Sequence, residues 1–165
     1  MKPKASLEER FDGWFVKPIE WLKELSKEGD GAFLALSAAL FLCERYYRTL
    51  TNTHEGSKDD ESFKVEAAKD MGLELNDFKI FWKVYRHGIQ HQGMPKRLVE
   101  HGVTYRWQID GSFNAIPQIH IIDAHTQAIR LDPWKFAELI ISKFKANPTI
   151  LEKATLHAFG EVFDS

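Results

Sequence analysis

The sequence predicts a mainly α-helical protein: an up-and-down helical bundle with a small antiparallel β-meander inserted before the C-terminal helices. Apolar residues recur at helical spacing over much of residues 18–91 and again after residue 133, whereas residues 103–109 alternate apolar and polar side chains. The chain has 165 residues, of which 44% are hydrophobic, and this is enough to bury one core. We therefore expect a single domain over residues 1–165, with the bundle at about 14–91 plus 133–160 and the meander at about 103–131.

Two helices are expected in the first 50 residues. A proline in the first turn, a stripe of isoleucine and leucine, and the stop signal of Gly29 predict a helix over Pro18–Lys27. Asp30 is a candidate N-cap for a long helix that reaches about Thr49. The first half of this second helix is apolar on nearly every side, which is typical of the centre of a fold.

A polar stretch over residues 52–62 reads as a surface loop, and two further helices are expected after it. The first covers about Glu61–Met71 and ends at Gly72. The second, capped by Asn76 or Asp77, runs to about His91.

The pattern changes after Pro95. The alternation in residues 103–109 is typical of a half-buried strand, and the Asp-Gly pair that follows is a turn signal. Further strands are expected at 118–123 and 127–131. Asp132 and Pro133 then suit the N-cap and first position of a helix over Trp134–Lys145, and a last helix is expected at about Thr149–Phe159.

Composition limits the binding partners and the cellular location that we expect for the protein. The net charge of -2 excludes a strongly basic protein, so contact with a polyanion requires a local patch. Cys43 is the only cysteine and cannot form an internal disulfide, which favours a reducing, cytoplasmic location. The most apolar run, residues 32–43, has 12 residues, well short of the roughly 20 needed to cross a bilayer, so no membrane contact is expected.

A helical wheel of the segment ending at His91, drawn with about 100° per residue, divides it into faces. One face is the expected core face, and it carries Phe78, Trp82, Tyr85 and Ile89. A second apolar stripe continues into histidines, and it carries Ile80, Val84, His87 and His91. A basic edge carries Lys79, Lys83 and Arg86. A helix that is apolar on two sides is either central to its bundle or packs on another chain, which suggests a homodimer through the second stripe.

These side chains suit phosphate chemistry. Near the helix C-terminus the dipole favours the protonated imidazole of His91, and a histidine that titrates near neutrality can act as an acid or base. Arg86 can hold a phosphate and stabilise developing negative charge, and Lys79 and Lys83 could follow an RNA backbone. The alternatives are a solvated helix edge and a capping histidine. On an ideal helix Arg86 and His91 lie about 140° apart, so a shared site requires a distortion, near Gly88, or a second subunit.

Residues 86–91, Arg-His-Gly-Ile-Gln-His, resemble the motif of the HEPN superfamily, in which an arginine and a polar residue precede a histidine. The resemblance implies a homodimer with a composite site and a metal-independent endoribonuclease of the kind found in toxin–antitoxin or phage-defence systems, with an antitoxin as a possible partner. Arg86 would bind phosphate, His91 would act as acid or base, and His87 would support them, without a cofactor. The alternative that the family offers is a non-catalytic dimer that binds a partner.

Three other patterns in the sequence carry weaker functional signals. His87 and His91, with Glu100 and His101 further along, form a weak candidate for a metal site, because the spacing lacks a tight ligand motif. Glu44 could orient a histidine, although an internal ion pair is the commoner role for such a residue. Tyr105 and Trp107 could stack on bases, but on an alternating strand they are expected in the core.

Overall fold

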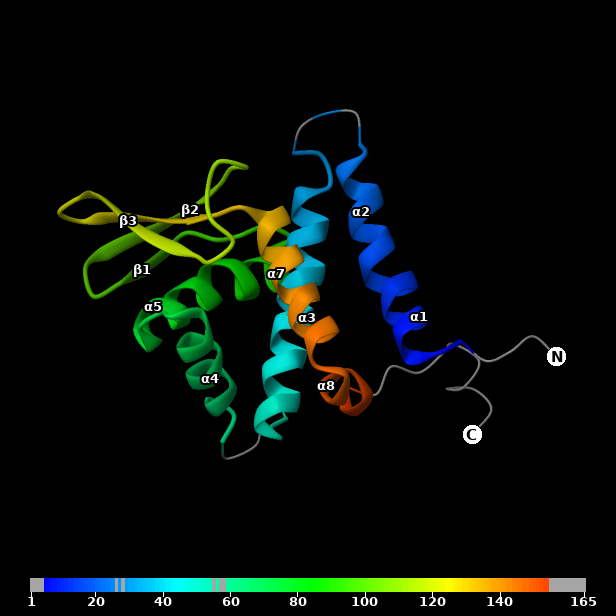
Figure 1. Cartoon of the computed structure of the whole chain (residues 1–165). Helices are drawn as coiled ribbons and strands as arrows, with labels where there is room; N and C mark the ends of the chain where they lie inside the picture. Colours follow the sequence, from blue (N-terminus) through cyan, green and yellow to red (C-terminus); the bar gives the residue numbers. More distant parts are fainter. Residues whose placement is uncertain (1–4, 26, 28, 55, 57–58, 155–165) are drawn as a thin grey trace.

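The computed structural model describes residues 5–25, 27, 29–54, 56 and 59–154. Its helices lie beside and beneath a sheet of four strands (Figure 1). The central helix α3, Ala32–Thr51, stands between the N-terminal helices on one side and α4 and α5 on the other (Figure 1). Its buried residues include Leu36, Leu40 and Tyr47, so the predicted central position is confirmed. Within the described part of the chain no helix combines the length and the apolar character that crossing a bilayer requires.

The chain begins with a helix that is longer than predicted and contains a wider turn. It consists of α1 (Leu7–Phe11), the π-helical segment η1 (Asp12–Val16) and α2 (Lys17–Lys23). Ser6 caps it through a reciprocal pair of hydrogen bonds with Glu9. The predicted helix over Pro18–Lys27 therefore covers only the last part of this element.

The predicted caps of the next helices were wrong, although the helices themselves exist. Gly31, in a left-handed conformation (φ 78°), precedes α3 in place of Asp30. Helix α4 covers Ser62–Met71 and ends at Gly72, as predicted. Helix α5 (Leu75–Phe81) begins after Glu74, ahead of Asn76 and Asp77, and continues through the π-helical segment η2 (Trp82–Arg86) into α6 (His87–Gln92).

The predicted antiparallel meander was wrong, and so was the mainly α fold class, because the strands form a mixed sheet. The strands are β1 (Leu98–Glu100), β2 (Val103–Ile109), β3 (Gln118–Asp123) and β4 (Thr126–Leu131), in the order β1-β2-β4-β3. β4 pairs with β2 in parallel and with β3 in antiparallel fashion. The fold is therefore mixed α/β.

The physical reason for this order is the composition of the last two strands. β4 carries Ala128, Ile129 and Leu131, all fully buried, and so occupies an interior position in the sheet. β3 is exposed along almost its whole length and takes the edge. The long connection after β2 gives the chain room to place β3 outside β4.

The C-terminal helices follow the prediction where they are described. Helix α7 covers Pro133–Ala146, and the Asp132 carboxylate accepts hydrogen bonds from the two backbone amides that open it, as an N-cap does. Helix α8 covers Pro148–Lys153, and the part of the predicted last helix beyond residue 154 lies outside the described residues.

One face of the sheet packs on the helices. The hydroxyl of Tyr85 in η2 donates to the backbone carbonyls of Gln108 (3.0 Å) and Ile129 (2.8 Å). The ring of Phe33 on α3 meets Trp107 edge to face, with ring centroids 5.8 Å apart. Tyr105 is buried and Trp107 packs against the core, so the core assignment for both is confirmed.

Candidate functional site

Arg86 is the last residue of the π-helical segment η2, and it is buried. The backbone N–H of His87 donates to the carbonyl of Trp82, five residues earlier, which widens this turn by one residue. The guanidinium of Arg86 faces α3, and the residue is only 8% exposed. A buried arginine needs charged or polar partners, because its charge has left water.

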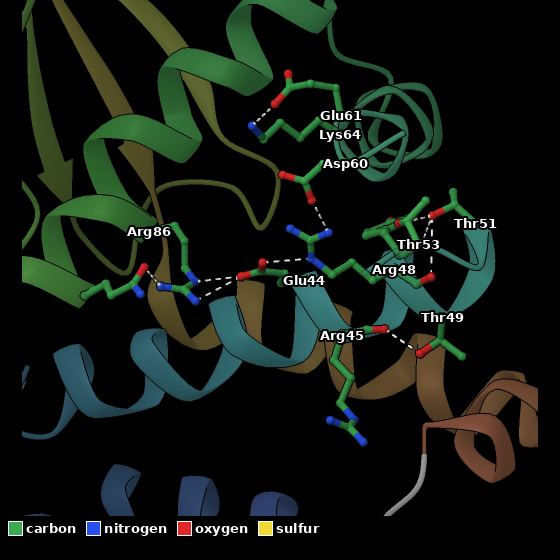
Figure 2. Close-up of polar contacts among 12 residues, drawn as sticks. Glu44, Arg45, Arg48, Thr49, Thr51, Thr53, Asp60, Glu61, Lys64 and Arg86 are labelled. Carbon is green, nitrogen blue, oxygen red and sulfur yellow. Dashed lines mark hydrogen bonds and ion pairs between the residues drawn. The ribbon is translucent and has the colours of Figure 1, made fainter. Parts of the chain in front are cut away.

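Those partners are supplied by two helices. Nε and Nη2 of Arg86 lie 3.0 and 2.9 Å from Oε2 of Glu44 on α3 (Figure 2). Nη1 donates to the side-chain oxygen of Gln90, one helical turn later, at 2.6 Å. The guanidinium carbon also lies 4.3 Å from the centre of the Phe41 ring. The arginine that the motif singled out is therefore fixed in one orientation.

Glu44 joins this arginine to a second one. Its other oxygen, Oε1, accepts a hydrogen bond from Nε of Arg48 at 2.9 Å, so that one carboxylate lies between two guanidinium groups (Figure 2). Arg48 also pairs with Asp60 and lies over the ring of Phe63. Burial alone would lower the pKa of Arg48, but its bonds to Asp60 and Glu44 outweigh burial and raise it.

The two arginines open on a pocket of about 920 Å³ beside the C-terminal half of α3, which we call the basic pocket. Its charged and ionisable lining residues are Glu44, Arg45, Arg48, His54, Arg86 and Lys153. Its other lining residues are Phe15, Phe41, Leu42, Thr49, Asn52, Thr53 and Ala154. Among the described residues that line it, four side chains are cationic and one, Glu44, is a carboxylate. Such a lining favours an anionic ligand.

Sequence reasoning missed His54. It lies in the polar stretch over residues 52–62, for which the sequence predicts a surface loop, and it lines the basic pocket together with Arg86. No local spacing signals this, because 32 positions separate the two residues in the sequence. His54 comes near Arg86 because α3 ends at Thr51, so that the segment after this helix lies at the pocket.

The two predicted histidines lie elsewhere. His87 is half-buried and His91 is exposed, and their rings are 6.4 Å apart. Neither lines the basic pocket, so within one chain the pocket unites Arg86 with His54. Burial lowers the pKa of His87, and the charges of Lys64, Lys96 and Arg86 lower it further.

The expected distortion between Arg86 and His91 is not present, because the π-helical segment ends at Arg86 and His87–Gln92 is an α-helix. Gly88 has a different role. A Cβ atom at this position would lie 2.5 Å from the backbone nitrogen of Lys96 and 2.8 Å from the carbonyl oxygen of Met94. The same segment is held by a hydrogen bond from the Lys96 N–H to the carbonyl of Val84, at 2.8 Å. Gly88 thus allows the chain after α6 to fold back directly against the helix.

The predicted basic edge is paired with carboxylates. Lys79 lies 3.0 Å from Glu61, and Lys83 lies 2.7 Å from Glu100. Both lysines are partly exposed, and neither lines the basic pocket. The solvated-edge alternative fits these contacts.

The second apolar stripe is covered by the chain itself. Ile80 is 3% exposed and Val84 is fully buried in a single copy, so these two residues cannot form the open face that suggested a homodimer. Only His87 and His91 of that stripe remain accessible.

No group of three or more potential metal-ligating side chains gathers anywhere in the described ranges. Comparison with known proteins finds no match: no family model, no curated protein and no solved structure matches this chain.

Proposed function

We propose that the protein binds RNA, and that the basic pocket holds a phosphate of its backbone. The observation that carries the proposal is that Arg86, the arginine of the HEPN-like motif, lines the same pocket as Arg45, Arg48 and Lys153. Guanidinium groups suit phosphate oxygens because they offer several N–H donors in one plane. RNA is chosen among phosphate ligands on the strength of the motif.

The ion pairs of the pocket support binding rather than oppose it. Glu44 holds Arg86 and Arg48 in fixed orientations, so a ligand does not have to order two long side chains. Arg45 and Lys153 also line the pocket and add cationic donors to it. A phosphodiester that enters the pocket therefore meets cationic side chains, two of which are already oriented.

Metal-independent endoribonuclease activity is the second candidate, and the position of His54 favours it. An imidazole and a guanidinium that line one pocket are the minimum for attack of a 2′-hydroxyl on the adjacent phosphorus. The histidine accepts the hydroxyl proton, and the arginine stabilises the charged phosphorane. The bond from phosphorus to the 5′-oxygen then breaks, and the histidine returns its proton to the departing 5′-oxygen. In the HEPN-type version of this candidate, a second copy of the chain brings His91 to the site, supported by His87.

A single set of assays tests both candidates. A 5′-fluorescein single-stranded RNA is titrated with wild type and with the variant Arg45→Ala/Lys153→Ala in EDTA. The salt concentration is about 0.1 M, where each lost phosphate contact weakens binding about fivefold. We expect the pocket variant to bind about 25-fold more weakly. The matched control Lys27→Ala/Lys69→Ala removes the same charge from exposed positions outside the pocket and should bind like wild type.

Cleavage is read from the same mixtures by gel electrophoresis. The nuclease candidate predicts products with 2′,3′-cyclic phosphate ends. Loss of cleavage in His54→Ala indicates the site within one chain, whereas loss of cleavage in His91→Ala indicates the dimeric site. Intact RNA in every lane leaves RNA binding as the function. If wild type and Arg45→Ala/Lys153→Ala bind equally, the basic pocket is not the RNA site.

A further inference from the structure

The sheet has a second face that does not pack on the helices. Side chains alternate along a strand, and Tyr105, Trp107 and Ile109 of β2 point toward the core. Arg106 and Gln108 therefore point the other way. The strand register places Arg106 beside Ala128 and His120, and Gln108 beside Arg130 and Gln118. We call this side the outer face of the sheet.

The outer face is rich in arginine. Arg106 on β2 is exposed, and Arg130 on β4 is half-buried. Arg97, just before β1, is exposed and reaches the same face, because its Nη2 lies 3.4 Å from the hydroxyl of Thr104. Carboxylates lie at the ends of this face: Asp123 at one corner, where it accepts a hydrogen bond from the backbone of His125, and Asp110 just after β2.

Among the described residues, these arginines differ from Arg48 and Arg86 in having no carboxylate partner. Within the described residues, none of the ion pairs involves Arg97, Arg106 or Arg130. By contrast Arg48, Arg86, Lys79 and Lys83 are all paired with carboxylates. Guanidinium groups gathered on one face without carboxylate partners create a positive potential that an external polyanion can neutralise.

An aromatic ring lies at one end of this face. Phe113, on the connection between β2 and β3, stacks with the guanidinium of Arg130 at 5.3 Å. Both line a hollow of about 590 Å³, whose other lining residues are Trp107, Gln108, Ile109, Asp110 and Ser112. An aromatic ring with a guanidinium beside it can receive a base by stacking, and the neighbouring amide can form hydrogen bonds with the base edge.

We propose that the outer face of the sheet is a binding surface for single-stranded RNA, with Arg97, Arg106 and Arg130 on the phosphates and Phe113 under a base. A single strand fits this surface because its bases are free to stack, whereas a duplex hides them. The sheet separates this surface from the helices, so it uses residues distinct from those of the basic pocket. The choice of RNA as the ligand rests on the proposed function.

The test uses the full chain and a 5′-fluorescein single-stranded RNA of mixed sequence, followed by fluorescence anisotropy from about 0.05 to 0.3 M salt. In Arg97→Ala/Arg106→Ala we expect about 25-fold weaker binding at 0.1 M salt, and a slope of log K against log salt that is smaller by about 1.4, because two phosphate contacts are lost. Both side chains are exposed, so the fold should persist, and circular dichroism confirms this. Lys27→Ala/Lys69→Ala is the charge-matched control.

The outcomes separate the two surfaces. Weaker binding and a smaller slope in the sheet variant, with the control unchanged, support the outer face. If the sheet variant binds like wild type while Arg45→Ala/Lys153→Ala is weakened, the outer-face proposal is wrong and the basic pocket stands. If the sheet variant alone is weakened, the outer face is the RNA site and the pocket proposal fails. Equal loss in the sheet variant and in Lys27→Ala/Lys69→Ala would show a general charge effect and overturn the outer-face proposal.

Discussion

Nε and Nη2 of Arg86 both donate to a single oxygen of Glu44, at 3.0 and 2.9 Å, and this pair links η2 to the middle of α3. The side chain of Arg86 is 10% exposed and that of Glu44 20%, so the pair is largely removed from water. When one partner of such a pair is deleted, the other is left as a poorly solvated charge, which is costly. The pair therefore matters both for the shape of the basic pocket and for stability.

The first prediction concerns this pair. Glu44→Gln should lower the free energy of unfolding by about 1–3 kcal/mol, because Arg86 loses its counter-charge while the shape of the side chain is kept. Urea denaturation followed by circular dichroism measures the change. A double-mutant cycle with Glu44→Ala and Arg86→Ala should give a coupling energy of about 0.5–3 kcal/mol. Additive effects within about 0.3 kcal/mol would show that the two side chains stabilise the fold independently.

A second prediction compares two glycines in helical segments. Gly88→Ala should destabilise the protein by about 1–3 kcal/mol, because the new methyl group would overlap the backbone of Met94 and Lys96. Gly13→Ala is the matched control: nothing lies within 4 Å of the added Cβ, so the better helix propensity of alanine should stabilise by about 0.5–1 kcal/mol. Thermal unfolding of both variants measures the difference. A stabilised Gly88→Ala would mean that the segment after α6 does not approach the helix this closely.

The sequence predicted most helices and three of the strands because their signals are local. Pro133 after Asp132, the left-handed Gly72, and the alternation through Val103–Ile109 each depend on neighbours within a few residues. The π-helical turns escaped prediction, since no residue pattern in η1 or η2 differs from that of an ordinary α-helix. β1, with only 3 residues, is too short for its alternation to be recognised.

Other features escaped prediction because they depend on contacts between residues that are far apart in the sequence. Parallel pairing of β2 with β4 depends on which strand is more completely buried, and hydrophobic alternation alone does not order strands. The contact of Arg86 with Glu44 joins residues 42 positions apart. The arginine that was predicted to bind phosphate is therefore already paired with a carboxylate and held in one orientation. The second apolar stripe on the helix was predicted correctly. Other parts of the same chain cover it, because Ile80 and Val84 lie in the hydrophobic core.

The third prediction is a pH dependence from His87. Burial, followed by the nearby positive charges of Lys64 and Lys96, lowers the pKa of this imidazole in the folded state, whereas an unfolded chain has a histidine pKa of about 6.5. Between these two values the unfolded state binds more protons, so the free energy of unfolding should fall as the pH drops from about 7 through 6.5 to the folded-state pKa. His87→Gln should flatten this part of the profile, measured by urea denaturation between about pH 5 and 8.

The control for this profile is His125→Gln, which replaces an exposed histidine in the turn between β3 and β4. It should keep the wild-type slope, because the substitution leaves His87 and its surroundings in place. If His87→Gln and His125→Gln give the same slope, the pH dependence arises elsewhere, and His87 is not held neutral by its surroundings.

The last prediction concerns the hollow at the end of the outer face. Phe113→Leu keeps an apolar side chain against Arg130 but removes the ring on which a base would stack, so affinity for single-stranded RNA should fall by about fivefold or more. Phe113→Trp retains a ring and should bind at least as tightly as wild type. Because the loss is not electrostatic, the salt slope should stay unchanged in Phe113→Leu, in contrast to the decrease expected for Arg97→Ala/Arg106→Ala. Anisotropy titrations at two or more salt concentrations separate these effects, and equal affinity of Phe113→Leu and wild type would remove the ring from the RNA-binding surface.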